Sequence, residues 1–306
     1  MNDLRCLFII PDSRESALNR HAVDLAVALG AHAVVSGDID VARLSRVTRM
    51  KIGGALDFIS SMRLGRLLKR ENINVAVAYT RHHLAALVRA RSVAGVDGIR
   101  ILYLVSDYSP APSIGVYSGL YGQADAIVFP ADKIRRGFID AFPSLNPVKV
   151  RAMYPYSDFK VGASIDTSSG SALFCDDLVA ESGIERVIDA MTDAVGRPFE
   201  RLHVIGTGPG RVVMPLVRKT RELSLPVEWH GAYSDTLLRE VASQCAVALC
   251  DFDSEARFNY ATPFFCGSMA VATIDNPEPT LYMEDEINGG FGQYVSSIKE
   301  LLHEIR

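Results

Sequence analysis

Short runs of β-branched and other apolar residues alternate along the chain with longer segments whose apolar positions recur every three or four residues. In the first half these apolar runs lie at 5–10, 31–36, 73–79, 99–105, 126–130 and 148–153. Helical periodicity occupies 16–30 and 84–95, and Gly30 and Gly95 stand where helix C-caps are expected. Strands that alternate with helices at this spacing predict βαβ units and a parallel sheet.

The alternation stops at 156–171, a stretch rich in Ser and Gly, and then begins again. We interpret residues 158–170 as an interdomain linker. The second set of predicted elements comprises strands at 172–175, 201–206, 227–231, 246–252 and 270–275, with helices at 181–195, 209–224, 234–244 and 291–306. The sequence therefore predicts an α/β fold of two consecutive doubly wound, Rossmann-like domains, 1–157 and 171–306, with a ligand site in the cleft between them.

Composition supports two domains with different roles. The chain has 306 residues, 48% hydrophobic and 22% charged, which suits globular domains and excludes a disordered or disulfide-based protein. Lys and Arg outnumber Asp and Glu by 20 to 13 in residues 1–157, whereas the acids outnumber the bases by 23 to 12 in residues 158–306. Such an asymmetry between halves indicates that the two domains meet different ligands.

Apolar runs and cysteines suggest where the protein resides. No apolar run is long enough to span a bilayer, and the first residues have an acid where a signal peptide would have bases. The five cysteines are scattered without the spacing of a zinc site, so we expect reduced thiols and no bound metal. We therefore expect a cytoplasmic protein.

The sharpest local motif is HVIGTGPGR, in which a predicted strand runs into Gly206, Gly208 and Gly210 before a predicted helix. Glycines let the backbone approach a ligand closely, and the free N–H groups of a helix N-terminus attract an anion such as a pyrophosphate. Two alternatives remain open. The loop can be a tight turn without a ligand, or part of an NAD site with Glu228 as the ribose-binding acid, although Arg211 stands where that motif has a third glycine.

The second half runs in order through the motifs ESGIERVIDAM, IGTGPG, VEWHGAY, AVALCDF and AVATIDN. This order resembles the donor-binding domain of GT-B glycosyltransferases, and glycosyltransferase family 4 in particular. In the first half, NRHAVDLAVALG, LVSDYSP and GLYGQADAIVFPADKIRRGFID give a weaker match to the same family. The resemblance implies a GT-B fold, with the acceptor on the N-terminal domain and a nucleotide-diphosphate sugar on the C-terminal domain.

The same resemblance implies an activity. It implies a metal-independent hexosyltransferase that retains the anomeric configuration, needs no cofactor, and uses a lipid-linked or cell-surface polysaccharide acceptor. Positioning and electrostatic stabilisation of the leaving diphosphate can supply most of the rate of such a reaction. Relatives in that family often carry a longer tail that crosses back to the first domain, whereas this sequence stops soon after its last predicted helix.

Several positions depart from the family pattern. The family carries two glutamates before the Gly turn, and here those positions are Ser254 and Thr262, with Glu255 one residue out of register. The usual Lys is Ser182, and the His of the N-terminal His-Asp pair is Ser106. These departures leave an alternative open: a catalytically impaired GT-B relative that binds a nucleotide-sugar or partners an active glycosyltransferase.

On the donor side, we expect the amides of Gly206, Gly208 and Gly210 together with Arg211 to hold the diphosphate. Tyr233 follows the next strand, where it can stack on the nucleotide base or simply cap the cleft.

The acidic loop after the strand 246–252 is the candidate for binding the sugar. Asp253, Ser254 and Glu255 can accept hydrogen bonds from sugar hydroxyls, with Glu255 also a catalytic candidate. Thr262 can contact sugar or phosphate in place of the missing glutamate. A merely solvated loop is the alternative.

On the acceptor side, His82 and His83 follow the strand 73–79, and Asp107 follows the strand 99–105. Either type of side chain can act as a base. The alternatives are residues at a helix start and an N-cap or Asx turn.

Residues 43–70 form a basic segment with eight Lys and Arg, one Asp and interspersed apolar residues. A basic amphipathic stretch can dock on an anionic membrane surface, and the alternative is an ordinary solvated helix face. We do not expect nucleic acid as a partner, because the segment lacks aromatic residues among its bases apart from Phe58, and the other half of the chain is acidic.

Overall fold

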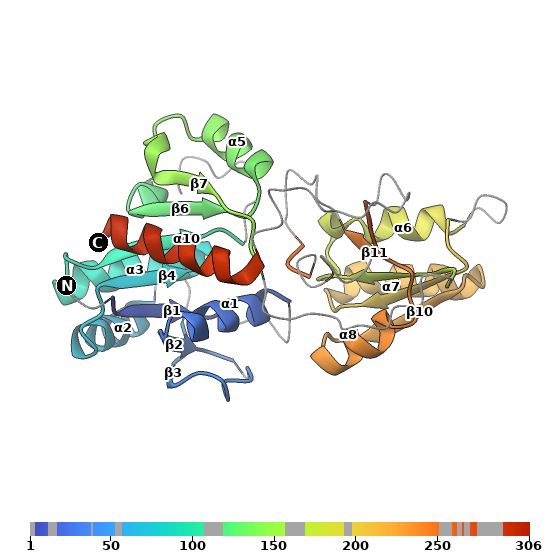
Figure 1. Ribbon diagram of the computed structural model, residues 1–306, viewed down its shortest axis with the longest axis horizontal. Coiled ribbons are helices and arrows are strands. Elements are labelled where there is room, and N and C mark those ends of the chain that lie inside the picture. Colours follow the sequence, from blue (N-terminus) through green and yellow to red (C-terminus); the bar gives the residue numbers. More distant parts are fainter. Residues whose placement is uncertain are drawn as a thin grey trace.

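A computed structural model of the chain has two parallel sheets, each covered by helices on both faces (Figure 1). The structure describes residues 4–11, 17–37, 39–52, 57–106, 119–156, 169–192, 198–250, 259–261, 265, 270–273 and 290–306. Each apolar run predicted from the sequence contains a strand, and both domains are doubly wound as expected.

The N-terminal sheet has seven strands in the order β3-β2-β1-β4-β5-β6-β7, all paired in parallel. Its strands are β1 (Cys6–Ile9), β2 (His32–Val35), β3 (Arg46–Arg49), β4 (Val75–Ala78), β5 (Arg100–Leu104), β6 (Ala126–Phe129) and β7 (Val150–Ala152). Its helices are α1 (Ala17–Ala28), α2 (Phe58–Arg70), α3 (Arg81–Ala94) and α5 (Asp132–Ala141), with a 3₁₀ turn at Pro147–Lys149.

The C-terminal sheet has five parallel strands in the order β10-β9-β8-β11-β12. Its strands are β8 (Ser171–Cys175), β9 (Arg201–Ile205), β10 (Val227–Gly231), β11 (Val247–Cys250) and β12 (Ala270–Thr273). Its helices are α6 (Ile184–Ala190), α7 (Gly210–Glu222) and α8 (Asp235–Ala242), with a 3₁₀ turn at Ala180–Ser182 before α6.

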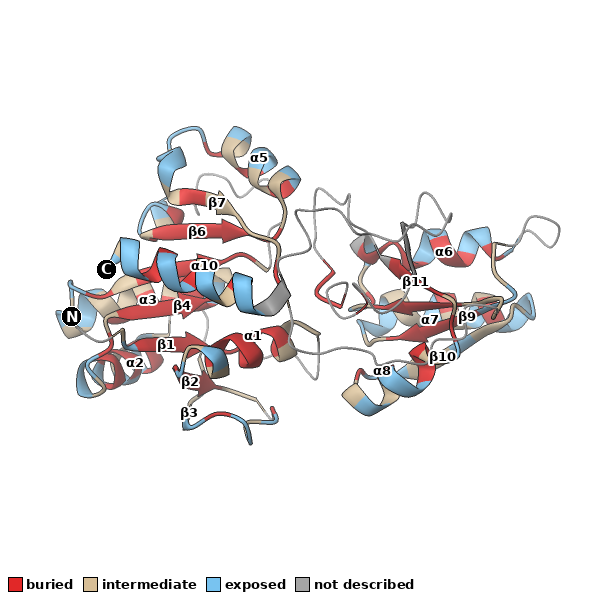
Figure 2. Ribbon diagram, in the orientation of Figure 1, coloured by how far each residue is buried: buried red, intermediate tan, exposed pale blue. Residues whose placement is uncertain are grey.

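Burial on both faces explains why the central strands read as unbroken apolar runs. Along β1, Leu7 and Ile9 belong to the cluster under α2, α3 and α5, whereas Cys6 and Phe8 belong to the cluster under α1. Figure 2 shows the strands at the centre of each sheet as buried. The predicted C-cap glycines are confirmed as left-handed residues, at φ +58° for Gly30 and +59° for Gly95.

The basic segment 43–70 is not one amphipathic stretch, because its first part forms the edge strand β3. That strand has no apolar run to reveal it; its sequence is RVTR and its two arginines are exposed. Arg46 and Arg49 donate to the carbonyls of Gly30 and Gly37, at 3.1 Å in both cases. Among the described residues of the segment, which exclude 53–56, the helical part is α2.

The last helix, α10 (Gly290–Ile305), packs on the N-terminal sheet although it follows the C-terminal one in sequence (Figure 1). Tyr294, Ile298, Leu301 and Leu302 are buried in the cluster that holds Phe8. Glu304 also pairs with Arg151 on β7, at 2.6 Å. The sequence predicts this helix as part of the domain 171–306, whereas its apolar face packs on the first domain. Across the described part of the chain, no helix is long and apolar enough to cross a membrane.

Candidate functional site

Side chains from the two domains meet where strands of both sheets end. The buried hydroxyl of Tyr260 donates to the carbonyl of Val105, directly after β5, at 3.2 Å. Arg20 on α1 forms an ion pair with Asp235 at the start of α8. Because ligands of open α/β sheets bind beyond the carboxyl ends of strands, this junction is the candidate site.

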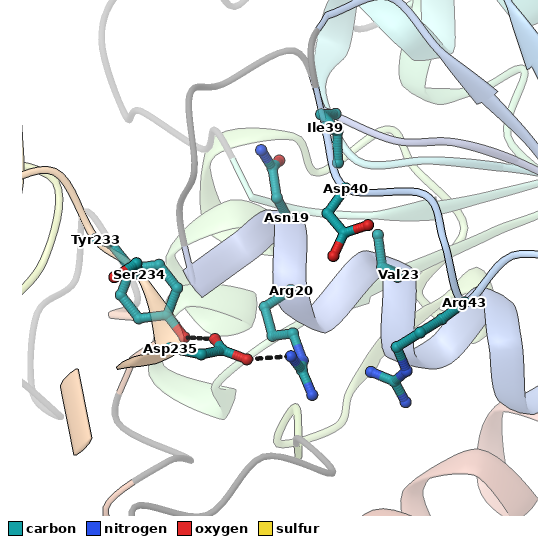
Figure 3. Close-up of a pocket in the computed structure, with 9 residues that line it drawn as sticks. All are labelled: Asn19, Arg20, Val23, Ile39, Asp40, Arg43, Tyr233, Ser234 and Asp235. Carbon is teal, nitrogen blue, oxygen red and sulfur yellow. Dashed lines mark hydrogen bonds and ion pairs between the residues drawn. The ribbon is translucent and has the colours of Figure 1, made fainter. Parts of the chain in front are cut away.

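A pocket of about 220 Å³ opens at this junction, between α1 and the segment that precedes α8 (Figure 3). Both domains contribute to its wall: Asn19, Arg20, Val23, Ile39, Asp40, Arg43, Tyr233, Ser234 and Asp235. The wall therefore offers guanidinium groups, carboxylates and an aromatic ring within one small space. Groups of this kind can bind the hydroxyls and phosphates of a sugar nucleotide or its acceptor.

Ion pairs hold the charged groups of this pocket in place. The carboxylate of Asp24, fully buried on α1, pairs with Arg20 at 3.0 Å and also with Arg43. Figure 3 shows Arg20 and Asp235 pointing toward one another. The carboxylate of Asp235 also accepts a hydrogen bond from the hydroxyl of Tyr233, at 2.6 Å. Burial and, after it, this bond raise the pKa of Tyr233 well above its usual range.

Two glycines of the loop between β9 and α7 are required by packing inside the protein. A Cβ atom on Gly206 would lie 1.9 Å from the carbonyl oxygen of Asp176, and one on Gly208 equally close to that of Leu178. Gly206 also has φ +152°, a conformation that other residues rarely adopt. The amide of Leu178 donates to the carbonyl of Thr207 at 2.9 Å, which ties the two loops together.

The third glycine is free of such contacts and opens α7 on the protein surface. Around Gly210 the nearest atom to an added Cβ is Cγ of Met214, at 3.9 Å. Pro209 is the N-cap and provides no side-chain cap for the first amides of the helix. Gly210 and Arg211 are both exposed. An uncapped helix N-terminus beside an exposed arginine is a suitable place for a phosphate.

Other candidates from the sequence have partners of their own. Tyr233 lines the pocket, but it is buried and its hydroxyl is bound to Asp235, so its ring is one wall of the pocket. A further base on the same helix as Arg211, Lys219, pairs with Asp189 on α6. Glu228, the ribose-binding acid of the NAD alternative, lies in the second position of β10 and pairs with Arg201 at 3.0 Å. It is therefore not at the carboxyl end of that strand, where such an acid is needed.

On the N-terminal side, Thr80 caps α3 by accepting from the amide of His83 at 3.2 Å. His82 is exposed and His83 is buried, both in the first turn of α3 directly after β4. Asp107, Asp253, Ser254, Glu255 and Thr262 lie outside the described residues.

A buried aromatic cluster behind the junction was not predicted from the sequence. His21 lies 5.4 Å from the ring centres of Tyr260 and Tyr294, and its nitrogens face the hydroxyl of Tyr294 and the carbonyl of Tyr156. Burial lowers the pKa of His21 to about 3, so this ring is neutral at neutral pH. The cluster joins α1, α10 and the segment 259–261, which come from distant parts of the sequence.

Solved structures resemble this chain along nearly its whole length. HepE from Anabaena, solved in complex with UDP-glucose, is 14% identical over 99% of this chain and 97% of its own, with a TM-score of 0.68. A glycosyltransferase from Rickettsia africae is 10% identical over 100% and 99%, with a TM-score of 0.65. An α-glucosyltransferase solved with UDP and DNA is 12% identical over 99% and 91%, with a TM-score of 0.61.

At these identities the likeness establishes the fold: the chain has the GT-B fold of glycosyltransferases. No family model matches the sequence, and no curated protein does. Membership of glycosyltransferase family 4 therefore stays a prediction.

Proposed function

We propose that this protein is a glycosyltransferase that moves a hexose from a nucleotide-diphosphate sugar to an acceptor hydroxyl. The observation that carries the proposal is the GT-B architecture over the full chain, shared with proteins solved in complex with UDP and UDP-glucose. The open N-terminus of α7 and the charged pocket at the domain junction support it, because a donor of this class presents a diphosphate and several hydroxyls.

The diphosphate binds at the first turn of α7, and Arg211 neutralises the charge that develops on the leaving group. Gly206 and Gly208 shape the loop, whereas Gly210 leaves room for the ligand. Asp253, Ser254 and Glu255, which follow β11 in the sequence, bind the sugar, and Thr262 contacts the sugar or a phosphate. Transfer retains the anomeric configuration and needs no metal ion, as the resemblance to family 4 implies.

The N-terminal domain binds the acceptor. His82 is accessible in the first turn of α3, whereas His83 is buried, so His82 is the better placed of the two to meet an acceptor hydroxyl. Asp107 is the second candidate base, because it comes two residues after Val105, whose carbonyl accepts a hydrogen bond from Tyr260.

The exposed face of α2 supports a membrane-bound acceptor. Phe58 and Ile59 are 54% and 65% exposed at the start of this helix. The same helix continues with four exposed bases: Arg63, Arg66, Lys69 and Arg70. A helix with exposed apolar and basic residues can bind the surface of an anionic leaflet, at about 1 kcal/mol per basic residue. We propose that α2 holds the protein at the cytoplasmic face of a membrane, where a lipid-linked acceptor resides.

Vesicle cosedimentation tests this membrane contact. The full chain should bind vesicles of phosphatidylglycerol and phosphatidylcholine, and binding should weaken with salt. Phe58→Ser combined with Ile59→Ser should reduce binding. The matched control is Val148→Ser, because Val148 is 75% exposed elsewhere on the same domain. Equal binding by both variants contradicts the role of α2.

One observation favours the second candidate, a GT-B relative that binds a nucleotide-sugar without transferring it. Ser182, where the resembled family carries a lysine, is buried and donates its hydroxyl to the carbonyl of Val179 at 2.8 Å. A neutral, internally bonded side chain cannot neutralise a diphosphate.

A thermal-shift panel of UDP, GDP, ADP, TDP, CMP and NAD, with and without the corresponding sugars, tests the proposed function. A ligand that binds only the folded state stabilises it by about 2.7 kcal/mol at a hundredfold excess over its Kd. We expect a shift with one diphosphate nucleotide and release of that nucleotide from its sugar. A shift without release of nucleotide favours the non-catalytic candidate, and a shift with NAD alone contradicts both.

A further inference from the structure

Three side chains on the edge strand β10 of the C-terminal sheet and on its neighbour β9 have their candidate ligand atoms close together. They are His203 on β9 and the pair Glu228 and His230 on β10. His203 is opposite Glu228 in the parallel register, and His230 lies two residues further along β10, where the register between the two strands shifts. The candidate ligand atoms of the three residues all lie within 4.8 Å of one another.

Two of the three separations between these atoms are close to those around a tetrahedral metal ion. Nδ1 of His203 lies 3.0 Å from Nε2 of His230 and 3.5 Å from Oε2 of Glu228. Bonds of 2.0–2.1 Å at tetrahedral angles separate two ligand atoms by about 3.3–3.4 Å. For a metal ion to bind both nitrogens, their separation must increase by a few tenths of an ångström and the rings must turn until both lone pairs point at the ion.

Without a metal, the two imidazoles share one proton. Their planes differ by only 13°, and a separation of 3.0 Å between ring nitrogens is that of an N–H···N hydrogen bond. In such a bond one ring nitrogen donates its proton and the other accepts it with a lone pair. For a metal ion to bond to both nitrogens, the shared proton must move to the other nitrogen of its own ring, so that each neutral ring offers one lone pair.

The surroundings orient the carboxylate and leave room for a further ligand. Arg201 binds the other oxygen of Glu228, Oε1, at 3.0 Å, so Oε2 stays directed at His203. The side chain of Glu228 is 46% exposed, which admits water to a fourth coordination position. Burial raises the pKa of the nearby Cys245 thiol to about 12, and we do not count this protonated group as a ligand.

We propose that His203, Glu228 and His230 form a binding site for a divalent transition-metal ion of the zinc class. Two imidazole nitrogens and one carboxylate oxygen suit Zn²⁺, Co²⁺ or Ni²⁺, whereas Mg²⁺ and Ca²⁺ prefer oxygen ligands. The site is structural and takes no part in sugar transfer.

A metal here would fasten the edge strand β10 to β9. His230 directly precedes Gly231, whose carbonyl accepts a hydrogen bond from the amide of Gly206 at 2.7 Å. The first glycine of the loop, Gly206, is thus hydrogen-bonded to the residue that follows the proposed ligand His230. Binding of the ion stabilises the end of β10 and, through this bond, the start of the loop.

Titration of the chelator-treated full chain with ZnCl₂ tests the proposal. We expect one tightly bound Zn²⁺ per chain by calorimetry, a higher Tm, and the intense visible absorption of tetrahedral Co²⁺ when cobalt is substituted. His230→Gln and Glu228→Gln should each weaken Zn²⁺ binding by at least about tenfold. Mg²⁺ should leave Tm unchanged.

His303→Gln is the matched control, because His303 is an exposed histidine on α10, outside the cluster. This variant should bind Zn²⁺ as the wild type does. Glu228→Gln changes an exposed side chain, so the test holds even where His230→Gln impairs folding. The proposal fails if Zn²⁺ does not stabilise the wild type, or if both cluster variants bind it with unchanged affinity. None of these measurements depends on nucleotide binding.

Discussion

Replacing Gly208 by Ala should destabilise the C-terminal domain, whereas the same change at Gly210 should not. A Cβ atom on Gly208 would lie 1.9 Å from the carbonyl oxygen of Leu178, and ordinary contact needs about 3.5 Å. The two loops must therefore separate by about 1.5 Å. Around Gly210, an added Cβ meets only Cγ of Met214 at 3.9 Å.

The cost of Gly208→Ala follows from what must move. Leu178 is held by its amide bond to the carbonyl of Thr207, at 2.9 Å, and losing such a hydrogen bond costs about 0.5–1.5 kcal/mol. Forcing extra atoms into a packed site costs about 1–3 kcal/mol. We expect a combined loss of about 2–4 kcal/mol. Gly210→Ala should change stability by no more than about 1 kcal/mol, in the stabilising direction, because Ala favours a helix.

Thermal and urea unfolding of the two variants, with the wild type beside them, measure this difference. Gly208→Ala should lower Tm by roughly 4–16 °C, and Gly210→Ala should leave it equal or slightly higher. If Gly208→Ala has the same Tm and the same free energy of unfolding as the wild type, then packing against Leu178 does not require a glycine at this position. A large loss in Gly210→Ala would likewise refute the distinction between a structural and a ligand-facing glycine.

Three further predictions concern single side chains. The folded-state pKa of His21, about 3, is below its unfolded value near 6.5, so the stability it contributes is complete above pH 6.5 and is lost as the pH falls toward 3. Urea unfolding at pH 7 and pH 5 should therefore show a loss of up to about 1.4 kcal/mol per pH unit, and His21→Phe should reduce that slope. Tyr260→Phe removes the buried hydrogen bond to Val105 and should cost about 0.5–1.5 kcal/mol in the same assay. Lys219→Ala should leave nucleotide affinity unchanged in calorimetry, because Lys219 pairs with Asp189.

The strands and the two-domain organisation were predictable because they depend on local apolar patterns. Parallel strands buried on both faces are short apolar runs, and each predicted run contains one. The strand β3 was missed for the same reason: at the sheet edge its arginines are exposed, so RVTR shows no such run. The packing of α10 was also missed, because an amphipathic helix does not specify which sheet its apolar face covers.

The candidate site was predictable only in part. The glycine loop is a local motif and was found from the sequence. Which of its glycines are required by packing could not be predicted, because Gly206 and Gly208 are constrained by the carbonyls of Asp176 and Leu178, in a loop distant in sequence. The cluster of His203, Glu228 and His230 was missed because it arises from the register between β9 and β10, and no short spacing in the sequence reveals it. The contact of Tyr260 with Val105 joins residues of different domains.

Calorimetric titration of the nucleotide selected by the thermal-shift panel tests the central claim most directly, namely that a nucleotide-sugar donor binds at the N-terminus of α7. A hydrogen bond to a charged group contributes about 1.5–3 kcal/mol, so Arg211→Ala should weaken binding at least about tenfold. Lys219→Ala, a change on the same helix at a residue already paired with Asp189, should bind as the wild type does. Absence of nucleotide binding by the wild type, or equal affinity of wild type and Arg211→Ala, would contradict the account.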